Sequence, residues 1–338
     1  MKAAVYIGKN ELKISTIPEP ELKESGAIIK VKGCGLCGSD IVKLREGVIS
    51  SGSVLGHEVV GYIDKISGNK DFKLGDRVVL GHHVPCFECA YCRGESYSMC
   101  LEFKNSNIFP GGFSEYIYVS EKHLDNTVLK IPENMPDEHA SFTEPVACCL
   151  RAVRRAVVKP GDIVLVIGLG SIGLIMGQML KYFGATVIGC DLLEQRIEMA
   201  DELGFDTVYK YTGDSEISGL IKSNFQHEGV DKAFLASGSD KSLPLSLNAV
   251  RDGGIILVFA SVSSNETGFA NNDIYYRELT ILGSYSPSPE DLKNSINLIE
   301  NNIIKVDKLF TIYDIKDINQ AIKDTISNKI IKGFIKIS

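Results

Sequence analysis

The sequence lacks the long apolar runs that membrane proteins carry. No uninterrupted apolar stretch approaches the ~18 residues of a membrane-spanning helix, so we expect no contact with a membrane. The first residues, MKAAVYIGKNELKIS, also lack the long apolar core of a secretory signal. Their alternation is typical of a first strand and hairpin. A reducing, cytoplasmic setting is the simplest interpretation.

The sequence also has no concentrated run of lysine and arginine. Together with a formal net charge of -7, this argues against binding to nucleic acid. Neither an internal repeat nor a low-complexity linker is present. The 44% apolar and 23% charged content is ordinary for a globular protein. At roughly 150 residues per domain, the 338 residues predict about two domains.

The nine cysteines are poor material for a disulfide framework, because their number is odd and no secretory signal precedes them. Four of them stand in the fifteen residues CFECAYCRGESYSMC, with the spacing C-x2-C-x2-C-x7-C. Close-spaced thiols in a cytosolic enzyme more often bind metal. The stretch therefore predicts a metal site, with redox regulation as the alternative; its cysteines are Cys86, Cys89, Cys92 and Cys100.

The texture of the chain changes near Pro160. Short β-type runs such as AIIKVKG and DRVVLG, punctuated by glycine, come before it and predict a strand-rich, barrel-like domain. After it, strands alternate with helices, which is the pattern of a parallel sheet with crossover helices. The sequence thus predicts an α/β protein with three segments: a β-rich domain at 1–150, a doubly wound domain at 151–288, and a C-terminal segment at 289–338 that returns to the first domain.

The stretch VLVIGLGSIG supplies a G-x-G-x-x-G pattern directly after an apolar strand and at the start of a helix. Here the glycines permit a tight turn, a close approach to a pyrophosphate, and close packing of helix on strand. The helix N-terminus offers free N–H groups to the anion. The residues predicted to bind the cofactor here are Gly168, Gly170, Ser171, Ile172 and Gly173.

Asp191 ends the next predicted strand, eighteen residues past Gly173. A carboxylate accepts hydrogen bonds from a ribose 2′-OH but repels a 2′-phosphate, so the sequence favours NAD over NADP. Arg196 follows five residues later. It either flanks the adenine or is a solvated helix residue.

Several motifs together resemble the zinc-dependent medium-chain dehydrogenases, similar to the sorbitol, threonine and galactitol-phosphate dehydrogenases. The resemblance covers essentially the whole chain and rests on CGLCGSD, GHE at 56–58, the four-cysteine stretch, GGFSEY at 111–116, EP at 144–145, and GLGSIG. It implies a GroES-like catalytic domain, a Rossmann domain for the cofactor, and two zinc ions per chain. It also implies a homotetramer or a homodimer.

By resemblance, Cys37, His57 and a carboxylate bind the catalytic zinc, and either Glu58 or Glu144 supplies that carboxylate. The four cysteines of the lobe at 85–100 would hold the structural zinc. Four thiolates saturate the metal and leave it a poor Lewis acid, whereas a mixed set leaves a position open for an alcohol.

The resemblance also assigns roles to the two residues that follow the CGLCG motif. Ser39 matches the family hydroxyl that accepts the alcohol proton, with a turn residue as the alternative reading. Asp40 matches the carboxylate that orients the zinc-bound histidine, with helix capping as its alternative.

Some positions depart from the family pattern or say little. Val42 stands where many relatives have the histidine that ends the proton relay. His82 and His83 are expected to be turn or surface residues. Lys43 or Arg45 could face a substrate phosphate. Arg277, with Glu278, matches a position on the cofactor side of the cleft, and is a weak candidate for a functional role.

The resemblance implies a small-molecule substrate and the NAD-linked oxidation of a secondary alcohol on a polyol, sugar alcohol or sugar-alcohol phosphate. A threonine-type amino-alcohol dehydrogenase is the alternative. Two other readings stay open: a redox- or zinc-responsive binding protein in which the cysteines are the sensor, and a zinc-free reductase of the same fold. The four cysteines count against the second of these.

Overall fold

The computed structural model describes residues 1–225, 228–261 and 271–338. The chain divides into two compact units. The first unit comprises Met1–Ala147, Pro287–Asn302 and Val306–Ser338, and the second comprises Cys148–Ser286 and Ile303–Lys305. The short segment Ile303–Lys305 is bound to the second unit by hydrogen bonds of 3.1 Å and 2.7 Å between the Gln178 side chain and the backbone of Lys305.

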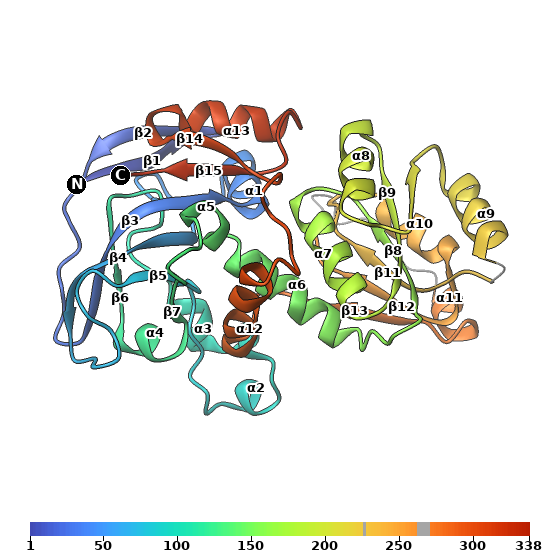
Figure 1. Ribbon diagram of the computed structural model, residues 1–338, viewed down its shortest axis with the longest axis horizontal. Helices are drawn as coiled ribbons and strands as arrows, with labels where there is room; N and C mark the ends of the chain where they lie inside the picture. Colours follow the sequence, from blue (N-terminus) through green and yellow to red (C-terminus); the bar gives the residue numbers. More distant parts are fainter. Residues whose placement is uncertain (226–227, 262–270) are drawn as a thin grey trace. The chain divides into compact units, whose positions relative to one another are not determined.

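The first unit is built on a seven-stranded sheet in the order β14-β15-β3-β4-β5-β7, with β6 also paired to β3. Figure 1 shows strands from both ends of the chain side by side in it, blue β3 next to red β15. Its strands are β3 (Gly26–Leu36), β4 (Glu58–Ser67), β5 (Arg77–Leu80), β6 (Tyr116–Val119), β7 (Val128–Lys130), β14 (Thr311–Asp314) and β15 (Gly333–Lys336). A hairpin of β1 (Lys2–Gly8) and β2 (Glu11–Thr16) precedes it.

Helices, most of them short, connect the strands of this sheet. The core beneath them is aliphatic and draws on β1, β3, β4 and the last helix of the chain. Burial of this apolar face is the main favourable term for the unit. The helices are α1 (Gly38–Glu46), α2 (Ala90–Arg93), η1 (Tyr97–Met99), α3 (Leu101–Asn105), α4 (Glu121–Asn126), α5 (Asp137–Ala140), α12 (Pro289–Glu300), η2 (Ile315–Asp317) and α13 (Ile318–Ile326). Helix α6 (Thr143–Arg155) begins in the first unit and ends in the second.

The second unit is a six-stranded parallel sheet in the order β10-β9-β8-β11-β12-β13. Strand β8 is buried at every position, as expected for a parallel strand covered on both faces. The order reverses between β8 and β11, and such switch points bind dinucleotides at the carboxyl ends of the strands. The α/β class with a separate β-rich domain is confirmed.

The elements of the second unit alternate strictly. They are β8 (Ile163–Ile167), α7 (Ser171–Tyr182), β9 (Thr186–Asp191), α8 (Glu194–Glu202), β10 (Thr207–Lys210), α9 (Asp214–Phe225), β11 (Val230–Leu235), α10 (Ser242–Ala249), β12 (Val250–Val258), α11 (Asn271–Tyr276) and β13 (Thr280–Gly283).

Candidate functional site

The cysteine lobe, residues 85–100, brings its four thiols together. The four Sγ atoms lie within 4.8 Å of one another, and Cys92 Sγ lies 3.8 Å from that of Cys86 and 3.6 Å from that of Cys89. A disulfide would need about 2.05 Å. A tetrahedron with Zn–S bonds of about 2.3 Å has sulfur–sulfur edges of about 3.8 Å, so the donor set fits zinc.

The lobe has little else to hold it. It contains one four-residue helix and one three-residue helix, and its buried apolar cluster consists of Cys92, Cys100 and Phe103. Backbone N–H groups point at its sulfurs, from Cys89 to Cys86 Sγ at 3.3 Å and from Cys86 to Cys100 Sγ at 3.4 Å. Such N–H donors stabilise thiolates. A core this small needs a further crosslink, which a metal ion would supply.

A second cluster joins Cys37, His57 and Glu58, whose donor atoms also lie within 4.8 Å of one another. We call it the Cys37 centre. Strand pairing builds it: β3 runs antiparallel to β4 with Gly35 opposite Glu58, so the residues just beyond these strand ends meet. Gly35 is required here, because a Cβ atom would overlap the Glu58 carboxylate. A thiolate, an imidazole and a carboxylate form a mixed set that suits an open zinc site.

Asp40 lies close to the partners of both roles that the sequence left open, and its role toward a metal-bound His57 stays a prediction. It is the third residue of α1, where Oδ2 accepts the N–H of Cys37 at 3.2 Å. Its Oδ1 lies 3.5 Å from Nδ1 of His57. Burial opposes the charge on His57, but Asp40 and Cys37 raise its pKa well above the ordinary value. With Nδ1 turned to Asp40, Nε2 is the atom left to bind a metal.

Lys332 is a member of this site that sequence reasoning missed. Its side chain is buried, and Nζ lies 2.8 Å from Oε1 and 2.6 Å from Oε2 of Glu58. Burial lowers the pKa of Lys332, but Glu58, then Cys37 and Glu144, raise it above the ordinary value. Lys332 stands just before β15, whose Gly333 pairs with Leu36, so a third strand end delivers it.

The remaining predicted residues lie nearby. Glu144 is buried in the first turn of α6. Its negative charge is among the causes that raise the pKa of Lys332. Ser39 is exposed in the first turn of α1. Val42 lies on the same helix and is half-buried.

His82 and His83 are half-buried, with His82 at a bend, and His82 lies closer to the predicted site than the sequence indicated. The ring centroids of His57 and His82 lie 4.6 Å apart, and those of His82 and His83 lie 4.2 Å apart. The register explains this, since Val60 pairs with Val79 and an antiparallel pairing continued by three residues sets His57 opposite His82. His82, which is half-buried, therefore packs against a predicted metal ligand.

The glycine turn of the second unit has the predicted geometry. Gly168 has φ +92, and a Cβ atom there would lie 2.6 Å from Cβ of Ser237. A Cβ atom on Gly173 would overlap the carbonyl of Gly168, so this glycine lets α7 pack against β8. Gly170 is the N-cap of α7, and Ser171 and Ile172 follow in its first turn, where N–H groups lack intrahelical acceptors.

Asp191 ends β9 and is tied to this turn. Its Oδ2 accepts the N–H of Leu169 at 2.6 Å, and its Oδ1 accepts the N–H of Leu193 at 3.0 Å. Nη1 of Arg196 lies 3.5 Å from Oδ2. Arg196 is therefore an ion-pair partner of Asp191, at the edge of the sheet where a dinucleotide would lie.

The sequence matches known families over most of its length. Residues 23–133 match the alcohol dehydrogenase GroES-like domain, and residues 171–301 match the zinc-binding dehydrogenase family. Sorbitol dehydrogenase of Bacillus subtilis is 32% identical over 294 residues, covering 84% of this chain and 82% of that protein. The chain belongs to the zinc-binding dehydrogenase family. This confirms the resemblance on which the predicted roles of Cys37 and His57 depend.

Two further relatives of this zinc-binding dehydrogenase agree. A protein described as a probable D-xylulose reductase A, from Emericella nidulans, is 30% identical over 345 residues, covering 98% of this chain and 95% of that protein. A solved Escherichia coli oxidoreductase of unknown specificity superposes with a TM-score of 0.90 at 30% identity, covering 100% of this chain and 99% of that one. Both span the whole length of the chain.

The interpretation of Arg277 as a residue of the cofactor side is wrong for this zinc-binding dehydrogenase. Its guanidinium donates to the carbonyl oxygens of Leu247 at 2.7 Å and Val250 at 2.6 Å, and pairs with Asp252 at 2.7 Å. Val250 begins β12, so Arg277 lies at the amino edge of the sheet, opposite the glycine turn.

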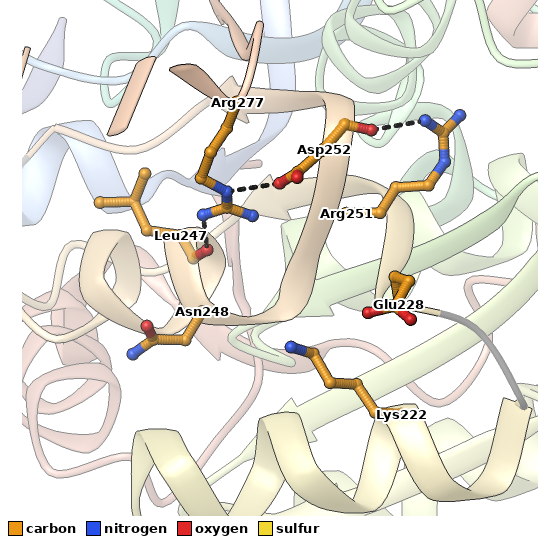
Figure 2. Close-up of a pocket in the computed structure, with 7 residues that line it drawn as sticks. All are labelled: Lys222, Glu228, Leu247, Asn248, Arg251, Asp252 and Arg277. Carbon is orange, nitrogen blue, oxygen red and sulfur yellow. Dashed lines mark hydrogen bonds and ion pairs between the residues drawn. The ribbon is translucent and has the colours of Figure 1, made fainter. Parts of the chain in front are cut away.

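Figure 2 shows the open pocket of about 580 Å³ that Arg277 lines, where the dashed contacts lock both arginines into the pocket wall. The remaining lining side chains are mixed in charge; they are Lys222, Glu228, Leu247, Asn248, Arg251 and Asp252. This pocket is thus a structural feature of the second unit.

Across the described residues, none of the helices combines the length and apolar character that crossing a membrane requires.

Proposed function

We propose that this protein is a zinc-dependent, NAD-linked dehydrogenase that oxidises a secondary alcohol of a polyol, sugar alcohol or sugar-alcohol phosphate to the ketone. The observation that carries the proposal is the convergence of Cys37, His57 and Glu58 within 4.8 Å in a chain that also carries the glycine turn. The names of the relatives, sorbitol dehydrogenase and D-xylulose reductase, support a polyol substrate.

Cys37 and His57 would hold the catalytic zinc, with Glu58 or Glu144 as the third ligand. Glu58 is held by Lys332, so its release toward a metal would break a buried ion pair. The charge of Glu144 also raises the pKa of Lys332, so both acids favour the charged form of this lysine.

When bound, zinc supplies Lewis acidity that lowers the pKa of an alcohol, and the nicotinamide accepts the hydride. The chain supplies the rest. Asp40 orients His57, and Ser39 Oγ accepts the proton that the alcohol loses. Because Val42 cannot carry a proton, the proton leaves Ser39 toward the cofactor ribose or solvent.

NAD is proposed as the preferred cofactor. The Asp191 carboxylate stands at the end of β9, beside the turn that would bind the pyrophosphate. Its charge would repel a 2′-phosphate, while Arg196 offsets that charge only from 3.5 Å. The expected test is a lower kcat/KM for NADP than for NAD, with the ratio moving toward one in Asp191→Ser.

The cysteine lobe is proposed to hold a structural zinc, giving two zinc ions per chain. The four identical ligands leave no position open for substrate. Metal analysis of the purified protein should give about two zinc ions per chain.

A homo-oligomer, either a dimer or a tetramer, in the cytoplasm is also proposed. In the described part of the chain, β13 forms an edge of the second sheet and pairs with β12 alone. The exposed side chains of Tyr275, Tyr276 and Tyr285 flank it. An exposed strand edge beside aromatic side chains favours pairing with another chain. Light scattering on the purified protein measures the number of copies.

A substrate panel tests the enzymatic proposal. It contains sorbitol, xylitol, a sugar-alcohol phosphate and threonine, each with NAD or NADP, and follows absorbance of the reduced nicotinamide with and without a zinc chelator. Polyol-dependent and chelator-sensitive reduction of NAD is the expected result. Oxidation of threonine alone would favour the amino-alcohol alternative. No turnover with any alcohol, in protein that binds two zinc ions, would contradict the proposal.

A further inference from the structure

A column of aromatic rings runs from the Cys37 centre to the cysteine lobe. The rings of His57 and His82 pack at 4.6 Å between centroids, those of His82 and His83 at 4.2 Å, and those of His83 and Phe103 at 4.9 Å, each pair tilted by 39–49°. Phe103 in turn packs with Cys92 and Cys100 in the small core of the lobe. All these residues belong to the first unit.

Hydrogen bonds hold the backbone next to the rings, on the histidine side and on the Phe103 side. The carbonyl of His82 accepts the N–H of Ile108 at 3.2 Å and lies 3.3 Å from Nε2 of His123. The hydroxyl of Ser106 accepts the N–H of Val84 at 2.8 Å and donates to the carbonyls of Val84 and Phe103, at 2.9 and 3.0 Å. The segment after β5 that carries the two histidines and the end of α3 are thus tied together.

His83 contributes to the column through its ring contacts. Nδ1 of His83 is buried with no hydrogen bond to any described residue. Burial first, then the charges of His123, His57 and Lys43, lower the pKa of His83 to about 4. A buried nitrogen without a partner costs free energy, so the stacking contact is what the residue contributes here.

His57 needs such a contact. Asp40 and Cys37 interact with the nitrogen atoms of its ring, Oδ1 of Asp40 from 3.5 Å, and contacts at these edge atoms leave the plane of the imidazole free to tilt about the line that joins them. The ring of His82 packs against the imidazole and sets its tilt. A metal ligand whose orientation is fixed by its neighbours binds more tightly and in one geometry.

We propose that His82 and His83 are positioning residues. Their rings, packed in sequence, couple the orientation of His57 to the cysteine lobe. The proposal rests on the proposed function, because it assumes that His57 binds the catalytic zinc. A change at Phe103, which packs against Cys92 and Cys100 of the lobe, should then affect the Cys37 centre. The lobe would be both a clamp on its own loop and a support for the reactive centre.

The first test compares His82→Ala with His82→Phe in the zinc-loaded protein. A chromophoric chelator follows release of the two zinc ions, alongside kcat and KM for the best alcohol of the panel. Loss of one stacking contact should speed release of the catalytic zinc about two- to tenfold in His82→Ala. His82→Phe keeps the ring and should stay near the wild-type rate. If His82→Ala does not fold, His82→Leu replaces it.

Two results would overturn the positioning role. Equal defects in His82→Phe and His82→Ala would show that a nitrogen atom matters, not the ring. Unchanged zinc release in His82→Ala would show that the ring does not support His57. A wild-type protein that binds no second zinc, or turns over no alcohol, would instead contradict the proposed function, so the two failures are distinguishable.

The second test measures the coupling itself. Phe103→Leu removes the last ring of the column, and Phe87→Leu removes a ring of the same lobe that stacks only on Tyr97 among the described contacts. Phe103→Leu should speed release of the catalytic zinc severalfold, and Phe87→Leu should not. In a His83→Ala background the effect of Phe103→Leu should disappear. Additive effects of Phe103→Leu and His83→Ala would contradict the coupling.

Discussion

The cysteine lobe and the Cys37 centre both bring thiols into a group of possible metal ligands, yet they are built in opposite ways. The lobe gathers four identical donors from fifteen consecutive residues around a small buried core. The Cys37 centre gathers three different donors from two strand ends, Cys37 just after β3 and His57 with Glu58 at the start of β4. Four identical ligands that are close in sequence suit a structural crosslink. Different ligands that the fold brings together suit a metal site with an open position for a substrate.

The substitution Cys37→Ala should separate the two sites most clearly, because it should affect activity and leave stability unchanged. Activity should fall about 10³-fold or more, because an alcohol loses its activating metal, and zinc content should fall by about one ion per chain. The far-UV spectrum and the melting temperature should change little. Cys34→Ala, three residues earlier, is the matched control and should keep its activity. Full turnover by Cys37→Ala would contradict the assignment of the reactive centre.

The opposite pattern is expected of Cys92→Ser. It should lose about one zinc ion per chain and several kcal/mol of stability, since a structural site contributes its binding free energy to folding. Activity per folded molecule should fall less than stability does. Urea unfolding and zinc analysis measure the first two, and active-site titration the third. Cys190→Ser, a buried cysteine of the second unit, is the control.

Lys332→Met probes how the Cys37 centre tolerates its own buried charges. Removing one partner leaves the Glu58 carboxylate buried and unpaired, which should cost about 3–5 kcal/mol of unfolding free energy. Adding Glu58→Gln should recover much of it. Lys329→Met is the matched control, because its side chain is 70% exposed and its pairing with Asp324 contributes little. Equal losses in the two methionine variants would contradict the pairing argument.

Asp40→Asn should weaken the Cys37 centre without touching the lobe. Orienting carboxylates typically change metal affinity or activity by about 10- to 100-fold. The asparagine oxygen can still accept the N–H of Cys37, so α1 should remain intact. Chelator competition should show looser binding of one zinc ion and unchanged binding of the other. Loosening of both ions would mean that Asp40 acts through the fold.

The ion pair of Asp231 with Arg251 in the second unit should give the smallest change in unfolding free energy of these variants. Burial opposes the charge of Asp231, but the N–H of Ile163 and the guanidinium of Arg251 lower its pKa. Its stabilisation is therefore present above the ordinary pKa of about 3.9 and is lost as pH falls through the lowered value. Asp231→Asn should cost about 1 kcal/mol at neutral pH and nothing in strong acid. A constant difference at all pH values would contradict this.

The sequence predicted what is local and missed what the fold brings together. The lobe and the glycine turn are contiguous, and their spacing alone indicated their chemistry. His82 was missed because its contact with His57 depends on the register of β4 against β5, which a sequence does not display. Lys332 lies 274 residues from Glu58, and an isolated lysine near the C-terminal strand resembles any surface lysine. Arg277 was misplaced because a motif match gives no indication of the sheet edge.

The placement of β15 has a consequence for the order in which the protein is made. This strand lies between β14 and β3, so the sheet of the first unit stays incomplete until residues 333–336 have been synthesised. The four thiols of the lobe, by contrast, are all present once residue 100 has emerged. During translation the lobe can therefore bind its metal early. Glu58 has no Lys332 partner until the last strand is made, and the second unit can fold before then. The inert metal would arrive first, and the reactive one last.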